Sequence, residues 1–139
     1  MNGAIPRPMV NHSAAVLDGK IYIIGGELTG YSLNVNVYDP HTNTWTQKKD
    51  MTSGKSDFGA VILNGKIITI GGDLGDVYTI VGDMQIYDPI SDTWTTTNTP
   101  LITPRVGLQS CLVDGKIYAI GGLLNWGASG SSSVEVYYE

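Results

Sequence analysis

Short apolar runs of four or five residues recur along the chain, separated by turn residues. The runs at 13–17 and 20–24 flank Asp18-Gly19, a dipeptide that favours the tight turn of a β-hairpin. The run at 35–38 alternates apolar and polar residues with period two, as a half-buried strand does. No segment sustains an apolar period of 3.6 residues. The pattern therefore predicts short antiparallel strands and almost no helix.

The same pattern occurs three times. Glycine pairs at 25–26, 71–72 and 121–122 recur at spacings of 46 and 50 residues, each closing a Lys-Ile-x-x-Ile-Gly-Gly segment that follows an Asp-Gly or Asn-Gly turn. Two copies continue with a Tyr-Asp-Pro segment, at Tyr38 and Tyr87, and then with Trp45 and Trp94. Each copy therefore predicts four strands, here termed a to d, in repeats at about 8–49, 50–99 and 100–139. The third copy reaches Tyr137 and stops before a tryptophan, so we expect it to lack most of its outer strand d.

Tandem four-stranded units of this length are typical of propeller blades. On its glycine pairs, its Asp-Gly turns, its tyrosines at 38, 87 and 137 and its tryptophans at 45 and 94, the chain resembles the kelch repeat family. The resemblance implies an all-β fold of kelch-type β-propeller blades. It also implies that the double glycine of strand b packs against a bulky aromatic of the same blade.

Three blades are fewer than the four to eight that usually close a propeller. An open arc would leave two apolar flanks in water, a larger patch than monomers usually expose. We therefore expect a homodimer in which two arcs complete a six-bladed ring. The alternative is that the chain is a piece of a longer propeller, or an engineered half.

Composition and charge exclude several classes of partner. The 139 residues carry a net charge of −5, with eight Lys and Arg against thirteen Asp and Glu, which argues against a nucleic-acid partner. The longest apolar run, 117–124, is too short to cross a membrane, and residues 1–11 do not resemble a signal peptide. We expect no membrane contact and, by default, a cytoplasmic location. A single cysteine excludes an intramolecular disulfide.

The chain offers little chemistry for catalysis. It has only two histidines, His12 at the start of a strand and His41 in a turn, and no metal-binding or nucleophile motif. Cys111 aligns with Ala15 and Val61, which predicts a small buried side chain. Asp73, Asp76 and Asp83 are interpreted as solvated loop carboxylates rather than a cation site. We therefore expect no metal, no cofactor and no catalytic residue.

The b–c and d–a connections should share one face of the blades, and loops of uneven length on a rigid scaffold commonly carry binding. Aromatic, charged and amide side chains on this face are the candidate ligand contacts: Arg7, Tyr31, Lys55, Asp76, Tyr78, Arg105, Asn125 and Trp126. The sequence predicts a non-catalytic module that binds a protein segment or a carbohydrate. The alternatives are a kelch-type carbohydrate enzyme, such as a sugar isomerase or mutarotase, and an assembly element without a ligand.

Overall fold

The computed structural model describes residues 3–27, 30, 32–75, 79–97 and 100–138. Within these ranges the regular structure consists of strands in three antiparallel sheets, and no helix is present. The strands are β1 (Ser13–Leu17), β2 (Lys20–Ile24), β3 (Val35–Asp39), β4 (Thr44–Lys48), β5 (Gly59–Leu63), β6 (Lys66–Ile70), β7 (Met84–Asp88), β8 (Thr93–Thr96), β9 (Gln109–Val113), β10 (Lys116–Ile120) and β11 (Val134–Tyr138). The part of the chain described here contains no helix that could span a membrane.

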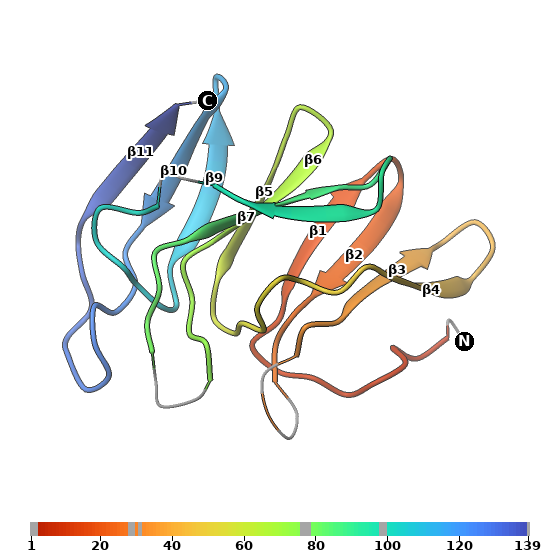
Figure 1. Cartoon of the computed structure of the whole chain (residues 1–139), viewed down its shortest axis with the longest axis horizontal. Helices are drawn as coiled ribbons and strands as arrows, with labels where there is room; N and C mark the ends of the chain where they lie inside the picture. The colour runs from red at the N-terminus through yellow and green to blue at the C-terminus, as the bar shows by residue number, and fades with distance from the viewer. Residues whose placement is uncertain (1–2, 28–29, 31, 76–78, 98–99, 139) are drawn as a thin grey trace.

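Each sheet is a simple meander, as the repeats predict. The orders are β1-β2-β3-β4, β5-β6-β7-β8 and β9-β10-β11, and the third sheet has three strands among the described residues. The sheets follow one another side by side, with their first strands β1, β5 and β9 adjacent along the middle of the molecule (Figure 1). This arrangement is that of successive propeller blades, and the three sheets are called blades 1, 2 and 3 below.

The turn between the first two strands of each blade has the predicted geometry. Asp18 and Gly19 both have positive φ, 50° and 71°, and the pairs at 64–65 and 114–115 repeat these values within a few degrees. Two successive positive φ angles define the type I′ turn, whose twist matches the flanking strands. In this turn Leu17 pairs with Lys20, so the register is set within one residue of the turn.

The turn between the last two strands is held by its aspartates. The Asp88 carboxylate accepts hydrogen bonds from the Ile90 amide at 2.9 Å and the Ser91 amide at 3.3 Å, and these bonds hold its pKa below the ordinary value. Tyr87 donates its hydroxyl to Asp92 at 2.7 Å and packs on Trp94, with ring centroids 5.1 Å apart. The tyrosine and tryptophan of the repeat are thus cross-strand partners that close this turn.

Two apolar clusters lie between the blades. The first joins blades 1 and 2 and contains Ala15, Leu17, Tyr22, Ile24, Val35, Val37, Met51, Phe58, Ile67, Tyr87 and Trp94. The second joins blades 2 and 3 and contains Val61, Leu63, Ile68, Ile70, Met84, Leu101, Leu108, Ile117 and Ala119. Blade 2 therefore contributes side chains from both of its faces, as a sandwiched propeller blade must.

The first glycine of each pair packs differently from our expectation. A Cβ atom at Gly25 would lie 2.7 Å from the Phe58 ring, and one at Gly71 would lie 3.1 Å from the Leu108 side chain. Phe58 and Leu108 belong to the following blade in each case. The first glycine thus admits a large side chain from the next blade. The second glycine has the expected contact in blade 2, where an added Cβ at Gly72 would lie 2.9 Å from the Cβ of Phe58 of the same blade.

Cys111 is also placed differently from our expectation. The residues at its repeat position, Ala15 and Val61, are buried between blades, whereas Cys111 is exposed. The reason is its place on the outer flank of blade 3, which no blade of this chain covers. His41 lies exposed in its turn, as predicted.

Candidate functional site

One face of the molecule gathers the connections that differ between blades. The β2–β3, β6–β7 and β10–β11 connections lie along this face, opposite the short β5–β6 and β9–β10 hairpin turns (Figure 1). We call it the loop face. The segments that enter each blade pass over it as well, and they carry the candidate residues Arg7, Lys55 and Arg105.

Lys55 is completely buried beneath this face. Its ammonium group donates to the Asp83 carboxylate at 2.7 Å and to the backbone carbonyls of Gly71 and Asp83 at 3.3 and 3.2 Å. Burial lowers the pKa of the Lys55 ammonium, and the Asp83 carboxylate opposes that shift. Lys55 thus joins the segment entering blade 2 to both ends of the β6–β7 connection.

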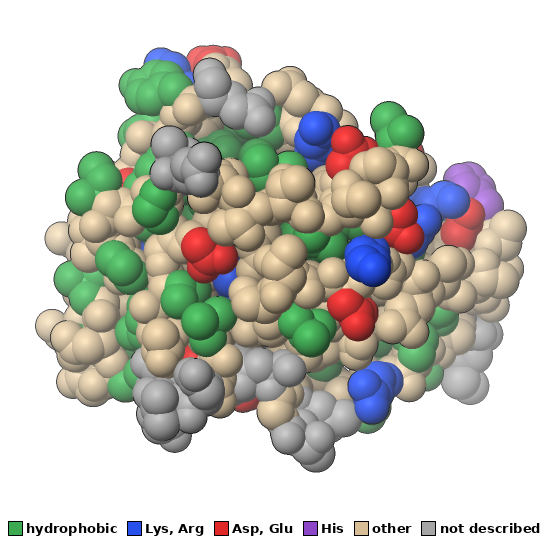
Figure 2. Space-filling view, in the orientation of Figure 1, with side chains coloured by type: hydrophobic (Ala, Val, Ile, Leu, Met, Phe, Trp, Pro, Cys, Tyr) green, Lys and Arg blue, Asp and Glu red, His purple; other side chains and the backbone are tan. Residues whose placement is uncertain are grey.

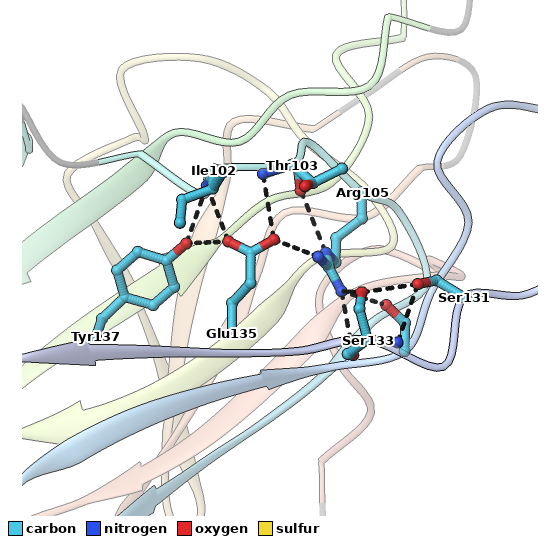
Figure 3. Close-up of polar contacts among 8 residues, drawn as sticks. Ile102, Thr103, Arg105, Ser131, Ser133, Glu135 and Tyr137 are labelled. Carbon is cyan, nitrogen blue, oxygen red and sulfur yellow. Dashed lines mark hydrogen bonds and ion pairs between the residues drawn. The ribbon is translucent and has the colours of Figure 1, made fainter.

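Arg105 has the same role in blade 3, with more bonds (Figure 3). Its buried guanidinium donates to the Ser133 hydroxyl at 2.7 Å and the Gly121 carbonyl at 3.1 Å, and it forms an ion pair with Glu135. Its Nε also donates to the Thr103 carbonyl at 3.2 Å. The planar guanidinium has five N–H donors against the three of an ammonium group, so it serves more carbonyl, hydroxyl and carboxylate acceptors at once.

Lys55 and Arg105 occupy equivalent positions of blades 2 and 3, 50 residues apart. Their hydrogen-bond partners are equivalent too, since Gly71 corresponds to Gly121 and Asp83 to Ser133. In blade 1 the equivalent position holds Met9, and the exposed Arg7 nearby in the chain donates its guanidinium to Asn34 at 3.3 Å. A buried basic side chain in the segments entering blades 2 and 3 therefore fixes the loop face from below. The buried Lys55 and Arg105 present no exposed side-chain surface to a ligand in this structure.

A second polar position of the repeat, occupied by Gln85 in blade 2 and Glu135 in blade 3, also holds the segments that enter these blades. Gln85 accepts hydrogen bonds from the amide and the hydroxyl of Thr52, at 3.1 and 2.6 Å. Glu135, at the same repeat position, accepts from the amides of Ile102 and Thr103 at 2.8 and 3.2 Å. These side chains satisfy backbone groups that no sheet ladder reaches.

The hydrogen bonds and the ion pair around Glu135 shift the pKa values of Glu135 and Tyr137. Burial alone would raise the pKa of Glu135, but the hydrogen bonds from the Tyr137 hydroxyl and the Ile102 amide, with the charge of Arg105, hold it below its ordinary value. Burial and the bond to Glu135 raise the pKa of Tyr137 to about 12. Glu135 is therefore ionised and Tyr137 neutral at neutral pH.

The exposed part of the candidate site centres on Trp126. Its indole donates to the Asp73 carboxylate at 2.8 Å, and its side chain remains 43% exposed. Asp73 is fully buried and also accepts from the Gly75 amide at 2.7 Å. A buried carboxylate of blade 2 thus orients an exposed tryptophan of blade 3, with exposed Asn125 beside it in the chain.

The structure separates the predicted site residues into three groups. Arg7, Asn125 and Trp126 lie exposed, whereas Lys55 and Arg105 are buried framework residues. Tyr31, Asp76 and Tyr78 lie outside the described residues. Sequence reasoning missed Asp73, Gln85 and Glu135 as supporting residues. Comparing the polar positions of the copies at the 50-residue spacing would have aligned Lys55 with Arg105 and Asp83 with Ser133.

The loop face does not form a metal site in the part that the structure describes. No group of three or more His, Cys, Asp or Glu side chains suited to a cation occurs among those residues. Asp73 and Asp83, two members of the acidic set considered from the sequence, are bonded to Trp126 and Lys55 instead.

A polar depression of about 350 Å³ lies where β1, β5 and β9 begin. Asp57 lines it, and its amide donates to the Asn11 carbonyl at 3.0 Å while its carbonyl accepts from the Gly107 amide at 2.7 Å. Burial raises the pKa of the Asp57 carboxyl. Positions 11, 57 and 107 are equivalent in the three copies, so these bonds run from blade to blade near the middle of the molecule.

Comparison with known proteins agrees with this architecture. The sequence model of a family described as the KLHDC2/KLHL20/DRC7 Kelch-repeats domain matches residues 1–122. The chain therefore belongs to the kelch-repeat family.

Several kelch-repeat proteins are about one third identical to this chain over the aligned residues. The chain is 35% identical over 119 residues to Kelch-like ECH-associated protein 1A of Danio rerio, covering 84% of this chain and 19% of that protein. It is 32% identical over 138 residues to Kelch repeat and BTB domain-containing protein 12 of Danio rerio, covering 84% of this chain and 22% of that protein. It is 32% identical over 127 residues to an F-box/kelch-repeat protein of Arabidopsis thaliana, covering 88% of this chain and 33% of that protein. The chain thus spans between 19% and 33% of these relatives.

Proposed function

We propose that this chain is a non-catalytic binding module that recognises a protein segment on its loop face. The observation that carries the proposal is Trp126, which is 43% exposed and oriented by the buried Asp73 carboxylate. A tryptophan held in place loses little conformational entropy on binding and offers a large apolar surface with a polar edge. Membership of the kelch-repeat family supports the proposal, as does the word "associated" in the name of one relative.

The framework below Trp126 supports recognition rather than chemistry. Asp73, Asp83 and Glu135 are each engaged by hydrogen bonds or ion pairs within the chain. Sugar-processing enzymes commonly need a pair of carboxylates free to exchange protons. The bonded state of these three carboxylates favours a scaffold that presents loops over the alternative of a carbohydrate enzyme.

The proposal is tested by selecting binders to the full chain from a displayed peptide library. Trp126→Ala should weaken binding of the selected peptides by about tenfold or more, as expected for an interface tryptophan. Ile90→Ala is the matched control, because Ile90 is an exposed apolar side chain on the opposite face. Equal binding by both variants would contradict the proposed surface. Binding to an array of glycans with no peptide selected would contradict the ligand class.

We also propose that the chain self-associates, a second copy covering the apolar flanks of blades 1 and 3. Cys111 provides a native probe, since it lies exposed on the flank of blade 3. Its alkylation should slow as the protein concentration rises into the range where copies associate. A rate independent of concentration would contradict this proposal.

A further inference from the structure

A groove between blades 1 and 2 lies apart from the loop face. Its volume is about 540 Å³, and it is formed by the β1–β2 turn and by β2, β3 and β4 of blade 1, with the β7–β8 turn of blade 2 opposite. The β1–β2 and β7–β8 turns lie next to each other at the side of the short hairpin turns (Figure 1). The groove thus belongs to a contact between two neighbouring blades inside the chain.

The floor of the groove is one face of the blade 1 sheet. Tyr22 pairs with Val37, and Val37 with Thr46, so the three side chains form a row on this face. Pro89 and Ile90 form the facing wall, and Ile90 is 96% exposed. The volume lies within the range of pockets that hold small molecules.

The Tyr22 hydroxyl is a buried donor without an acceptor. The Tyr22 side chain is 5% exposed and its ring centroid lies 6.0 Å from that of Tyr87, but its hydroxyl makes no hydrogen bond with the described residues. Burial, followed by the charges of Asp18 and Asp92, raises the pKa of Tyr22, so the group is a donor at neutral pH. Packing between blades does not require it, since Ile68 occupies the same position in the next contact. A donor left unpaired at a buried site needs another explanation.

The charges along the groove cancel. Two lysines, Lys20 and Lys48, and two aspartates, Asp18 and Asp39, line it. Lys20 and Asp39 form an ion pair at 3.5 Å, whereas the side chains of Lys48 and Asp18 have no ion pair or hydrogen bond in the part of the chain that the structure describes. Figure 2 shows basic and acidic side chains interspersed on this side of the molecule, on the right. The groove therefore offers both donors and acceptors without a net charge.

From these observations we infer that the groove between blades 1 and 2 binds a neutral saccharide. Each sugar hydroxyl both donates and accepts, which matches the unpaired donors of Tyr22 and Lys48 and the unpaired carboxylate of Asp18. A carboxylate or phosphate would instead be repelled by the aspartates near the Tyr22 hydroxyl. The apolar wall at Pro89 and Ile90 suits the C–H face of a sugar ring. This site is separate from the loop face and goes beyond the function proposed above.

The test applies the full chain to an array of neutral glycans and measures the dissociation constant of the best-bound glycan by titration calorimetry. Tyr22→Phe should weaken binding by about fivefold or more, because it removes the donor and keeps the ring. Tyr118→Phe is the matched control, since Tyr118 holds the equivalent position of blade 3 and does not line the groove. It should leave the dissociation constant within about twofold of the unmodified chain.

A second pair of variants tests the other wall position. Thr46→Val should also weaken binding severalfold, whereas Thr95→Val, the same change at the equivalent position of blade 2, should not. An array without a bound glycan, or equal affinities for Tyr22→Phe and Tyr118→Phe, would overturn the inference. Glycan binding lost in Trp126→Ala would place the sugar on the loop face instead, and selected peptides that bind less tightly to Tyr22→Phe would assign the groove to a protein segment. Either result would also overturn it.

Stability separates a binding role of the Tyr22 hydroxyl from a structural one. Tyr22→Phe should leave the urea midpoint unchanged or slightly higher, because this hydroxyl has no acceptor among the described residues. Tyr87→Phe should lower the midpoint, because the hydrogen bond to Asp92 is lost. Equal losses in the two variants would show that the Tyr22 hydroxyl serves the fold, and would overturn the inference.

Discussion

At the residue scale, the same structural task is performed by different chemistry in successive blades. Lys55 with Asp83 and Arg105 with Glu135 both place a buried cation beneath the loop face. Removing one partner of such a pair leaves an unpaired charge in a poorly solvated site, which costs far more than the intact pair contributes. These residues therefore belong to the framework that holds the loops in place.

Arg105→Ala should lower the free energy of unfolding by about 3–5 kcal/mol, because Glu135 and three backbone carbonyls lose their donor. The free energy of unfolding of Arg105→Lys should lie between those of Arg105→Ala and the unmodified chain, since an ammonium group keeps only some of the hydrogen bonds that the guanidinium makes. Arg7→Ala is the control, because Arg7 is an exposed cation in the segment that enters blade 1. Urea unfolding measures all three, and equal losses for Arg7→Ala and Arg105→Ala would contradict the framework role.

Glu135 also predicts how stability depends on pH. Its folded pKa lies below its ordinary value of 4.5, so its contribution is complete above that value and is lost as the pH falls through the folded pKa. Glu135→Gln should therefore be less stable than the unmodified chain at pH 7, with the difference shrinking in acid. Unfolding free energies at several pH values test this, and a difference that grows on acidification would be the contrary result.

Individual residues were predictable where local geometry dictates them. The Asp-Gly and Asn-Gly turns require two positive φ angles, which those residues adopt readily, and they were predicted correctly. The burial of Lys55 and Arg105 depends on partners 28 and 30 residues away. The sequence identified them as notable cations on the correct face but gave no sign of that burial, because charged side chains are rarely buried without a partner.

At the element scale, strand positions follow from alternation and turns, whereas packing between sheets does not. The repeat correctly predicted the four-stranded meander but did not predict that its tyrosine and tryptophan pair beside the second turn. It did not predict that the first glycine of each pair contacts the following blade, since spacing within one repeat carries no information about its neighbour. Cys111 was misjudged for the same reason: a repeat position implies burial only where another blade follows.

Gly71→Ala should destabilise the chain more than Gly65→Ala. Both glycines have positive φ, 64° and 73°, so both variants pay about 1 kcal/mol of backbone strain. Only at Gly71 would the new Cβ meet the Arg105 carbonyl at 2.7 Å and the Leu108 side chain at 3.1 Å, which adds about 1–3 kcal/mol. Thermal or urea unfolding compares the two, and equal losses would contradict the role of this glycine between blades.

At the scale of the whole molecule, the chain presents two kinds of surface. The loop face offers Trp126 on a fixed framework, and the flanks of blades 1 and 3 are apolar sheet faces that no blade of this chain covers. The first supports recognition of a protein segment and the second supports closure by another copy. Both proposals depend on the blades acting as rigid, repeated units.

The molar mass of the full chain in solution, measured by light scattering across a range of concentrations, tests closure most directly. Closure by a second copy predicts about 30 kDa, twice the 14.9 kDa of one chain. A well-folded species of a single chain's mass at every concentration would contradict it.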